Sequence, residues 1–249
     1  MNSGQTIIQL ERVDSTNNYL REHPELWGRQ FTAVIAREQT GGRGRLSRKW
    51  HSEPGRDLTF STLFRPEAAP GDATVITLGA GLAAYRCLRP LLDGGLNLKW
   101  PNDLCYGDKK IGGVLCEMII DGAVSVVIIG IGINVNSTRF PDDIAATAGS
   151  IAAITGRSHD PRVLCEEILE QCARIIPRFR APLDAGLLNE WIAASSSIGS
   201  AVFFIDEGER RSGTIAGING DGSLRIRLSA DEEISGFRGE LFYNPEMRK

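Results

Sequence analysis

The chain has 249 residues, 42% of them hydrophobic and 24% charged, and a formal net charge of -3. This composition is ordinary for a globular protein and excludes a fibrous, disordered or disulfide-stapled chain, while the length allows one large domain or one large and one small. The negative balance also argues against a general nucleic-acid binder, because binding to phosphates requires a basic surface.

Neither a disulfide framework nor a zinc site is indicated, because the five cysteines form no C-x-x-C pair and the three histidines stand far apart. The N-terminus has no basic region followed by an apolar stretch, which excludes an ordinary secretory signal. The most apolar run, 123–135, is shorter than the roughly 20 residues that a membrane-spanning helix needs. We therefore expect reduced, mostly buried thiols in a cytoplasmic protein that does not enter a membrane.

The first third of the chain alternates predicted regular elements with one unusual loop. Asp14 and Ser15 are good N-cap residues for a short helix, and "FTAVIAREQ" (31–39) predicts a buried strand. "DLTFSTLFRP" (57–66) alternates apolar and polar residues, which predicts a half-buried strand. The stretch "TGGRGRLSRKW" (40–50) is therefore expected to be a loop between two strands.

The middle of the chain predicts a helix over 71–92, with Arg86 and Arg89 near its C-terminal end, where the helix dipole favours them. "NLKWPND" (97–103) follows as a strand that Pro101 stops. The apolar segment 112–136 predicts two long strands around Asp121-Gly122, a dipeptide that suits a type I′ hairpin turn.

The last part of the chain changes from helices to short strands. Asp160 and Pro161 begin a predicted helix over 160–179, and "LLNEWIAAS" predicts a shorter one. Three serines at 195–197 mark a boundary, after which turn residues separate short strands in the manner of a small β-barrel. We expect an α+β domain built on a mixed sheet over 1–197 and a small all-β domain over 198–249.

The Gly/Arg loop has the chemistry to wrap an anionic ligand, because glycine lets backbone N–H groups approach oxygens and guanidinium groups pair with phosphate or carboxylate. The alternatives are an RGG-like RNA-binding segment, which would normally repeat in disordered surroundings, and a solvated basic loop.

Common nucleotide-binding loops are absent: there is no G-x-x-x-x-G-K-[ST], and "GIGINV" lacks the third glycine of a dinucleotide site. The segment "KWPNDLCYGDKKIGG" offers another route. Asp103 could help hold magnesium, and Lys110 precedes two glycines that would let a phosphate approach. Taken singly, Asp103 is better explained as a turn-stabilising residue after Pro-Asn, and Lys110 as a solvated hairpin residue.

Four motifs occur in the order seen in one enzyme family: "DSTN" (14–17), "QTGGRGRLSRKW" (39–50), "KWPNDL" (99–104) with Lys110 following, and "GIGINVN" (130–136). The chain thus resembles the biotin protein ligases. The resemblance implies a catalytic domain like that of class II aminoacyl-tRNA synthetases with a C-terminal SH3-like barrel. It implies ATP, biotin and Mg²⁺ as ligands, formation of biotinyl-5′-AMP, and transfer of biotin to a lysine of a biotin carboxyl carrier domain.

The same resemblance implies roles for particular residues. Catalysis would depend on Lys110, Arg45 and Asp103, with Asp103 as a magnesium ligand or as the group that takes a proton from the acceptor lysine. Biotin would contact Ser15, Thr16, Asn17, Gln39, Gly42, Arg43, Gly44, Arg45, Lys110, Gly113 and Gly132. ATP and the adenylate would contact Arg43, Arg45, Arg48, Trp50, Asn102, Lys110 and Asn134.

The sequence departs from the family pattern in two places. Leu46 and Ser47 stand where some members have an arginine and a glycine, which bears on the mobility of the loop. Only thirteen residues precede Asp14, too few for the DNA-binding domain of the repressor members, so we expect the short, catalytic type or a trimmed form without DNA binding.

Three further possibilities remain at this point. A lipoate protein ligase and a non-catalytic biotin-binding regulator are the rival functions. A homodimer formed through an edge strand is compatible with the sequence.

Overall fold

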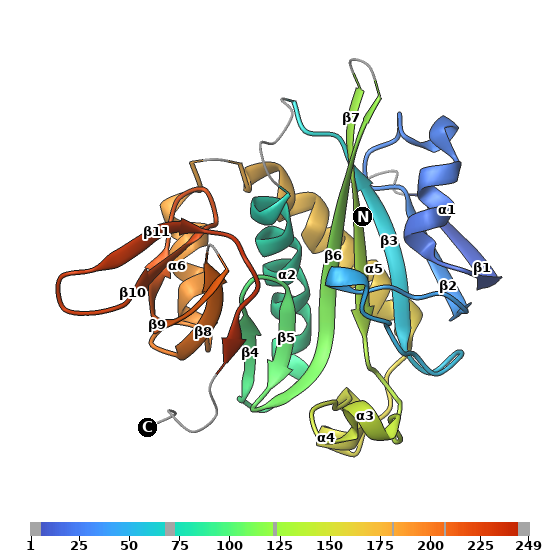
Figure 1. Cartoon of the computed structure of the whole chain (residues 1–249). Helices are drawn as coiled ribbons and strands as arrows, with labels where there is room; N and C mark the ends of the chain where they lie inside the picture. Colours follow the sequence, from blue (N-terminus) through green and yellow to red (C-terminus); the bar gives the residue numbers. More distant parts are fainter. Residues whose placement is uncertain (1–5, 68–72, 122–123, 181, 207, 244–249) are drawn as a thin grey trace.

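The computed structural model describes residues 6–67, 73–121, 124–180, 182–206 and 208–243 (Figure 1). Within these ranges the chain forms a seven-stranded and a five-stranded sheet. The large sheet has the order β1 (Ile7–Val13), β2 (Ala33–Gln39), β3 (Leu58–Phe64), β7 (Val124–Ile133), β6 (Lys109–Asp121), β5 (Asp103–Tyr106) and β4 (Leu96–Lys99). The order of the small sheet is β11 (Glu233–Phe237), β10 (Leu224–Arg227), β9 (Glu209–Ile218), β8 (Ala201–Asp206) and β12 (Phe242–Tyr243).

The large sheet is mixed, as predicted. β1 and β2 are parallel and are connected through α1 (Thr16–Glu22), whereas all the other neighbouring pairs are antiparallel. The long β6 and β7 strands run through its centre, so the predicted apolar hairpin is confirmed (Figure 1). Its turn includes Gly122, which lies outside the described residues, so the predicted turn type is not tested.

The prediction that β3 is half-buried is wrong, because all seven of its residues are buried. β3 lies between β2 and β7, and α1 and α5 (Pro161–Ile175) both pack against it. Its polar side chains are compatible with burial because they find partners. Thr59 and Thr62 each donate a hydrogen bond of 3.0 Å, to the carbonyl oxygens of Ala36 and Thr32.

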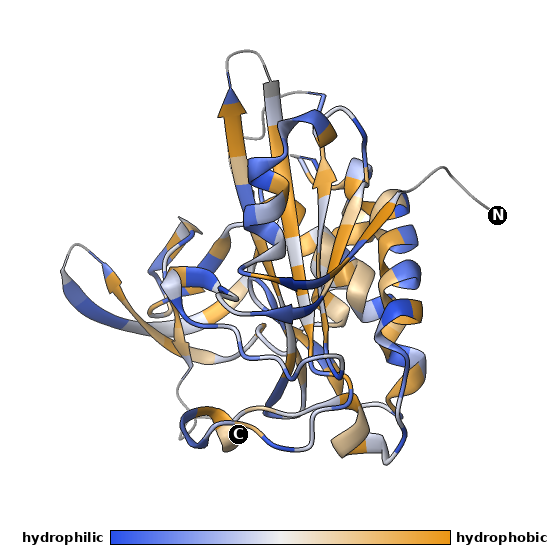
Figure 2. Ribbon diagram, turned by 90° about the vertical axis from the view of Figure 1, so that its right-hand side faces the viewer, coloured by the Kyte–Doolittle hydropathy of each residue, from blue (hydrophilic) through white to orange (hydrophobic). Residues whose placement is uncertain are grey.

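Two long helices cover the sheet. α5 begins where its Asp160 cap accepts a hydrogen bond from Arg162 N, and it buries one apolar stripe, which alternates with hydrophilic residues in Figure 2. α2 (Thr74–Leu88) is buried on nearly all sides and approaches its neighbours closely, since a Cβ atom at Gly79 would lie 2.8 Å from the Phe179 ring. In the described ranges, no helix combines the length and apolarity needed to cross a membrane.

The remaining helical segments are short. They are η1 (Pro24–Leu26), η2 (Arg45–Ser47), η3 (Arg89–Leu91), α3 (Asp142–Ala145), α4 (Ile151–Thr155), η4 (Ile176–Arg178) and α6 (Ala185–Ala193). The helix predicted over 71–92 thus ends as an α-helix at Leu88 and continues as η3, which contains Pro90. Four of the elements were not predicted from the sequence, namely β1, β5, α3 and α4.

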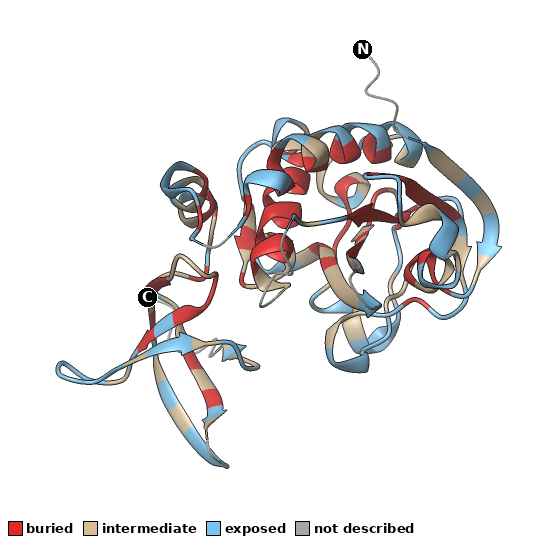
Figure 3. Cartoon of the chain, turned by 90° about the horizontal axis from the view of Figure 1, so that it is seen from above, coloured by how far each residue is buried: buried red, intermediate tan, exposed pale blue. Residues whose placement is uncertain are grey.

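The small antiparallel sheet confirms the predicted all-β region and lies to one side of the large sheet, with most of its outer surface exposed (Figure 3). It is nevertheless packed against the rest of the chain. Trp100 Nε1 donates a 3.0 Å hydrogen bond to Gly222 O, and Phe204 and Ile226 belong to the same buried cluster as the core of the large sheet. The division at residue 197 remains a prediction.

None of the five cysteines forms a disulfide, and three of them are buried. Burial raises the pKa of Cys116 and Cys165 to about 12, so that these thiols stay protonated at neutral pH.

Candidate functional site

A cavity of about 580 Å³ opens where the Gly/Arg loop crosses the large sheet. Its size falls within the range of about 300–1,000 Å³ that is usual for small-molecule sites. It is lined by the start of α1, the loop after β2, parts of β3, β6 and β7, the segment 134–148 and the segment 239–243. The sequence-predicted residues that line it are Ser15, Thr16, Asn17, Gln39, Arg43, Gly44, Arg45, Arg48, Trp50, Asn102, Asp103, Lys110, Gly113, Gly132 and Asn134.

Gly42 is the one predicted residue that does not line this cavity. It is buried within the loop, where its carbonyl oxygen accepts a 2.9 Å hydrogen bond from Trp50 N. A Cβ atom at Gly42 would lie 2.9 Å from Trp50 O, so glycine is needed here for the loop to close on itself.

The loop itself is a small hairpin. Gly44 N donates a 2.7 Å hydrogen bond to Arg48 O, and Arg43 pairs with Lys49. Leu46 and Ser47 form its tip with φ values of 55° and 59°, in the left-handed region that favours glycine. Ser47, where the family pattern led us to expect glycine, therefore has a backbone shape that glycine adopts most readily.

One end of the cavity is polar and neutral. Thr16 N donates a 2.8 Å hydrogen bond to Gln39 Oε1, and the hydroxyl groups of Thr16 and Ser61 lie 2.6 Å apart. Ser61 Oγ donates to Asn17 Oδ1 at 2.5 Å. These side chains come from three separate elements, α1, β2 and β3, and Ser61 was not among the predicted residues.

A carboxylate lies behind this polar end. Glu117 Oε2 on β6 accepts a 2.6 Å hydrogen bond from Asn17 Nδ2, and Glu117 Oε1 forms ion pairs with Arg21 at 2.9 Å and with Arg43 at 3.4 Å. Burial would raise the pKa of Glu117, but the hydrogen bonds from Asn17 and Arg21, with the charges of Arg21 and Arg43, hold that pKa below its usual value. Glu117 is a lone charge in the apolar run "VLCEMII", which is a sequence signal that could have identified it.

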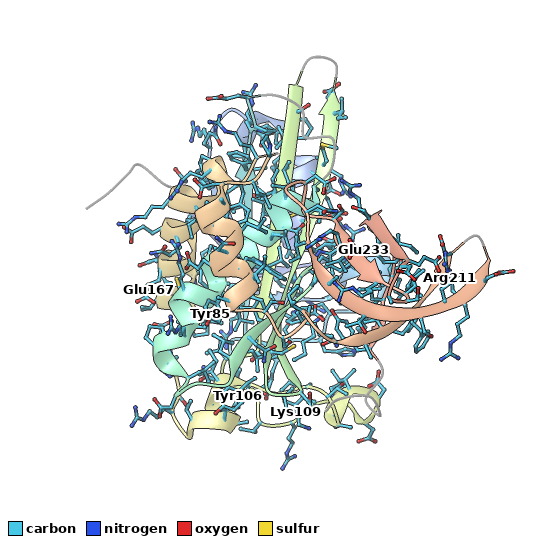
Figure 4. The ribbon with its side chains drawn as sticks, turned by 90° about the vertical axis from the view of Figure 1, so that its left-hand side faces the viewer. Tyr85, Tyr106, Lys109, Glu167, Arg211 and Glu233 are labelled. Carbon is cyan, nitrogen blue, oxygen red and sulfur yellow. The ribbon has the colours of Figure 1, made fainter. Side chains whose placement is uncertain are left out.

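The other end of the cavity is charged. Lys110 Nζ lies 2.6 Å from Asp103 Oδ1 and 5.9 Å from the centre of the Trp50 ring. Arg45 Nη1 donates a 3.4 Å hydrogen bond to Asn102 Oδ1. The neighbouring Lys109 lies at the outer surface at the lower end of the molecule (Figure 4), so alternation along the strand places only one of the two lysines at the cavity.

The segment after β7 borders the charged end. Asn134 is buried and donates a 2.8 Å hydrogen bond to Gly149 O. Apolar and neutral side chains from the following loop and α3 also line the cavity, namely Phe140, Ile144, Thr147 and Ala148. No sequence motif pointed to these residues, because the loop that carries them has no recognisable pattern of its own.

The carboxylate of Asp57 holds the segment after β7 in place through hydrogen bonds. This buried carboxylate accepts hydrogen bonds from Val135 N at 2.9 Å, from Glu53 N at 2.9 Å and from Ser137 Oγ at 2.5 Å. One side chain thus connects the segment that follows the Gly/Arg loop to the backbone beside Asn134.

The small C-terminal sheet contributes to the cavity wall. Arg48 in the Gly/Arg loop forms an ion pair with Glu240, and the hydroxyl of Tyr243 lies 2.9 Å from Ser197 Oγ. Lys99 Nζ lies 4.0 Å from the centre of the Tyr243 ring. Burial raises the pKa of Tyr243 to about 12, so that its hydroxyl stays protonated and can donate.

A metal site formed by protein ligands alone is not found in the part of the chain that the structure describes, where no group of three or more His, Cys, Asp or Glu side chains could hold an ion. Asp103 fits a different arrangement, in which one carboxylate meets a magnesium ion whose other ligands are phosphate oxygens and water.

Comparison with known proteins gives the same family from sequence and from structure. Residues 9–134 match the model of the biotin/lipoate A/B protein ligase family. The chain is 36% identical over 169 residues to the bifunctional ligase/repressor BirA of Bacillus spizizenii, covering 67% of this chain and 52% of that protein. The chain therefore spans about half the length of this relative.

A relative of similar length is the biotin–[acetyl-CoA-carboxylase] ligase of Paracoccus denitrificans, with 32% identity over 90% of this chain and 95% of that protein. Among solved structures, biotin protein ligase from Aquifex aeolicus in complex with biotin and ATP matches with a TM-score of 0.82 and 30% identity, covering 96% of this chain and 98% of that one. The Leishmania major enzyme in complex with biotinyl-5-AMP matches with a TM-score of 0.66 and 28% identity over 96% and 98% of the chains.

Proposed function

Because the chain belongs to the biotin/lipoate A/B protein ligase family, we propose that it is a biotin protein ligase. It activates biotin with ATP to biotinyl-5′-AMP and then transfers biotin to a lysine side chain. The observation that carries this proposal is a single cavity with a neutral, hydrogen-bonding end at Thr16 and Asn17 and a cationic end at Lys110 and Arg45. Biotin has the matching polarity, with a neutral ureido ring at one end and a carboxylate at the other.

In the first step the biotin carboxylate attacks the α-phosphorus of ATP, and pyrophosphate leaves. Two anions must approach each other, so the reaction needs fixed positive charge where the pentavalent phosphorus develops. Lys110 and Arg45 supply it, and the backbone N–H groups around Gly44 can approach the phosphate oxygens. A magnesium ion carried by ATP, met by the Asp103 carboxylate, would neutralise part of the triphosphate charge.

The remaining site residues position the two substrates. Ser15, Thr16 and Gln39 bind the ureido end of biotin, with Asn17 behind them. Gly113 leaves room for Lys110 and Gly132 for the Trp50 ring. Trp50, Asn134 and the segment 140–148 enclose the nucleotide, with Arg48 and Asn102 at its border. Arg43 belongs to the neutral end, where it pairs with Glu117. The Gly/Arg loop excludes water from the adenylate, because a mixed anhydride is readily hydrolysed.

In the second step the ε-amine of an acceptor lysine attacks the adenylate carbonyl, and AMP leaves. A free lysine with a pKa of about 10.4 is almost wholly protonated at neutral pH and cannot attack. We assign the proton transfer to Asp103, whose carboxylate lies at the charged end of the cavity, 2.6 Å from the Lys110 ammonium group. The acceptor is the biotin carboxyl carrier domain of a biotin-dependent carboxylase.

The predicted domain 198–249 contacts the Gly/Arg loop through the ion pair between Glu240, in the segment between β11 and β12, and Arg48. We propose that the protein acts in the cytoplasm with its carboxylase partner. Strands β1 and β4 lie at the two edges of the large sheet, and a homodimer would form through an edge strand.

The proposal is tested by incubating the protein with biotin, MgATP and a purified carrier domain, and measuring the mass of the carrier domain. The expected result is the addition of one biotin, lost when the acceptor lysine is changed to arginine or when ATP is omitted. Addition of lipoate in place of biotin, or no modification at all, would contradict it.

A further inference from the structure

The direction of the hydrogen bonds at the neutral end of the cavity can be derived from Glu117. An ionised carboxylate can only accept hydrogen bonds, so the Asn17 group that lies 2.6 Å from Glu117 Oε2 must be its NH₂. The Asn17 carbonyl oxygen then points the other way, toward Ser61 Oγ at 2.5 Å. Since a carbonyl can only accept, the Ser61 hydroxyl must donate its single proton to Asn17.

The direction of the next hydrogen bond, between Ser61 and Thr16, is fixed in the same way. The Thr16 and Ser61 hydroxyl oxygens lie 2.6 Å apart, and the Ser61 proton is already used, so the proton between them must come from Thr16. Thr16 Oγ1 also lies 3.0 Å from Gln39 Oε1, which accepts from Thr16 N at 2.8 Å, but the 2.6 Å contact with Ser61 is shorter and has no other proton, so the Thr16 proton lies there. The lone pairs of Thr16 Oγ1 are therefore left as an acceptor at the cavity, and the Gln39 NH₂ is left as a donor.

This chain of donors and acceptors is held rigidly. Asn17, Thr16 and Ser61 are 4%, 3% and 0% exposed, so water cannot easily replace one of the partners. The Asn17 amide also packs on the bare backbone of Gly130, where a Cβ atom would lie 2.4 Å from Asn17 Oδ1. Glu117 is itself fixed by Arg21 from α1 and by Arg43 from the Gly/Arg loop.

We propose that Glu117 is a positioning residue that sets the donor and acceptor pattern with which the cavity recognises a cyclic urea. This inference rests on the proposed function. A cyclic urea offers two N–H donors and one carbonyl acceptor, and the fixed pattern provides an acceptor at Thr16 and a donor at Gln39. The dithiolane ring of lipoate has neither group and gains no hydrogen bonds from the pattern. Glu117 therefore favours the binding of biotin over that of lipoate.

The substitution Glu117→Gln tests this role with little change in shape. The introduced amide can donate as well as accept, so Asn17 can turn its own amide around and the whole chain of hydrogen bonds can reverse. We expect the KM for biotin in ATP–pyrophosphate exchange to rise about tenfold, which corresponds to about 1.4 kcal/mol. The KM for ATP should stay within about twofold, because the nucleotide lies at the other end of the cavity.

A double variant distinguishes hydrogen-bond direction from a merely structural effect. In N17D/E117Q the amide and the carboxylate exchange places. The carboxylate introduced on α1 accepts hydrogen bonds from the amide introduced on β6 and from Ser61. The Ser61 and Thr16 hydroxyl groups therefore donate in the same directions as in the wild type. We expect most of the lost biotin affinity to be recovered. 2-Iminobiotin carries a protonated imine, which donates a hydrogen bond where the ureido carbonyl of biotin accepts one. The preference for biotin over 2-iminobiotin should therefore fall in E117Q and recover in the double variant.

A matched control is Glu190→Gln, since Glu190 on α6 pairs with Arg86 as Glu117 pairs with Arg21, but away from the cavity. This control should leave the KM for biotin unchanged. The inference is overturned if E117Q keeps the wild-type KM for biotin, if the KM values for biotin and ATP rise together, or if the double variant is no better than E117Q. Exchange by the wild-type protein that does not depend on biotin would instead overturn the proposed function itself.

Discussion

The indole ring of Trp50 packs directly on Gly132, so that a Cβ atom on this glycine would lie 2.5 Å from Trp50 Cε2. Trp50 Nε1 is buried there without a hydrogen-bond partner among the described residues. The absence of a side chain at Gly132 thus gives the loop tryptophan its place over strand β7.

Changing Gly132 to alanine should push the indole out of this place. We expect the KM for ATP to rise about tenfold, because the loop that encloses the nucleotide can no longer rest on the strand. The comparison is Gly156→Ala, at an αL helix cap outside the cavity, which should destabilise the fold without changing this KM. The idea fails if Gly132→Ala binds ATP as the wild-type protein does.

Lys110→Ala should nearly abolish adenylate formation. Removing one fixed charge at a developing anion costs about 10²–10³ in rate, or roughly 3–4 kcal/mol. Single-turnover formation of biotinyl-5′-AMP measures this step alone, and Lys109→Ala, on the outer side of the same strand, is the control. A turnover near that of the wild type would remove Lys110 from the mechanism.

Asp57→Asn should destabilise the fold by about 1–3 kcal/mol, because an amide NH₂ would face donors that now bind the carboxylate. Urea unfolding followed by circular dichroism measures the change, with the exposed Asp93→Asn as a control. Equal unfolding midpoints for the two variants would show that the hydrogen bonds of Asp57 contribute nothing.

The stabilising effect of Glu117 should depend on pH in a defined direction. The pKa of this carboxyl is lower in the folded chain than the usual value of about 4.3, so folding favours the ionised form. The free energy that Glu117 contributes to folding is fully present when the pH is above that usual pKa. It is lost as the pH falls through the lower pKa of the folded chain. The difference in free energy of unfolding between the wild type and E117Q should therefore shrink below about pH 4; a difference that grows there would contradict the assignment.

Local signals in the sequence were enough to predict the helices that begin at a clear cap residue and the strand that ends at a proline. The helices after Ser15 and Asp160 and the strand before Pro101 are all present. The burial of β3 could not be predicted in the same way, since it depends on which strands and helices surround it. The four-residue β5 is too short for a periodic pattern, and its pairing with β6 stabilises it.

The candidate site shows the same limit. The Gly/Arg loop and the "KWPND" segment were found because their residue types are unusual for loops, and they do line one cavity. Ser61 and Glu117 were missed because each is a single polar residue in an apolar strand, and only the folded sheet brings them to Asn17. The roles of all these residues stay predictions until the variants are measured.

The most direct test of the account is exchange of labelled pyrophosphate into ATP, with biotin, with lipoate and without either. The account predicts exchange that requires biotin and is absent with lipoate. Exchange with lipoate alone, or no exchange despite measurable biotin binding, would contradict it.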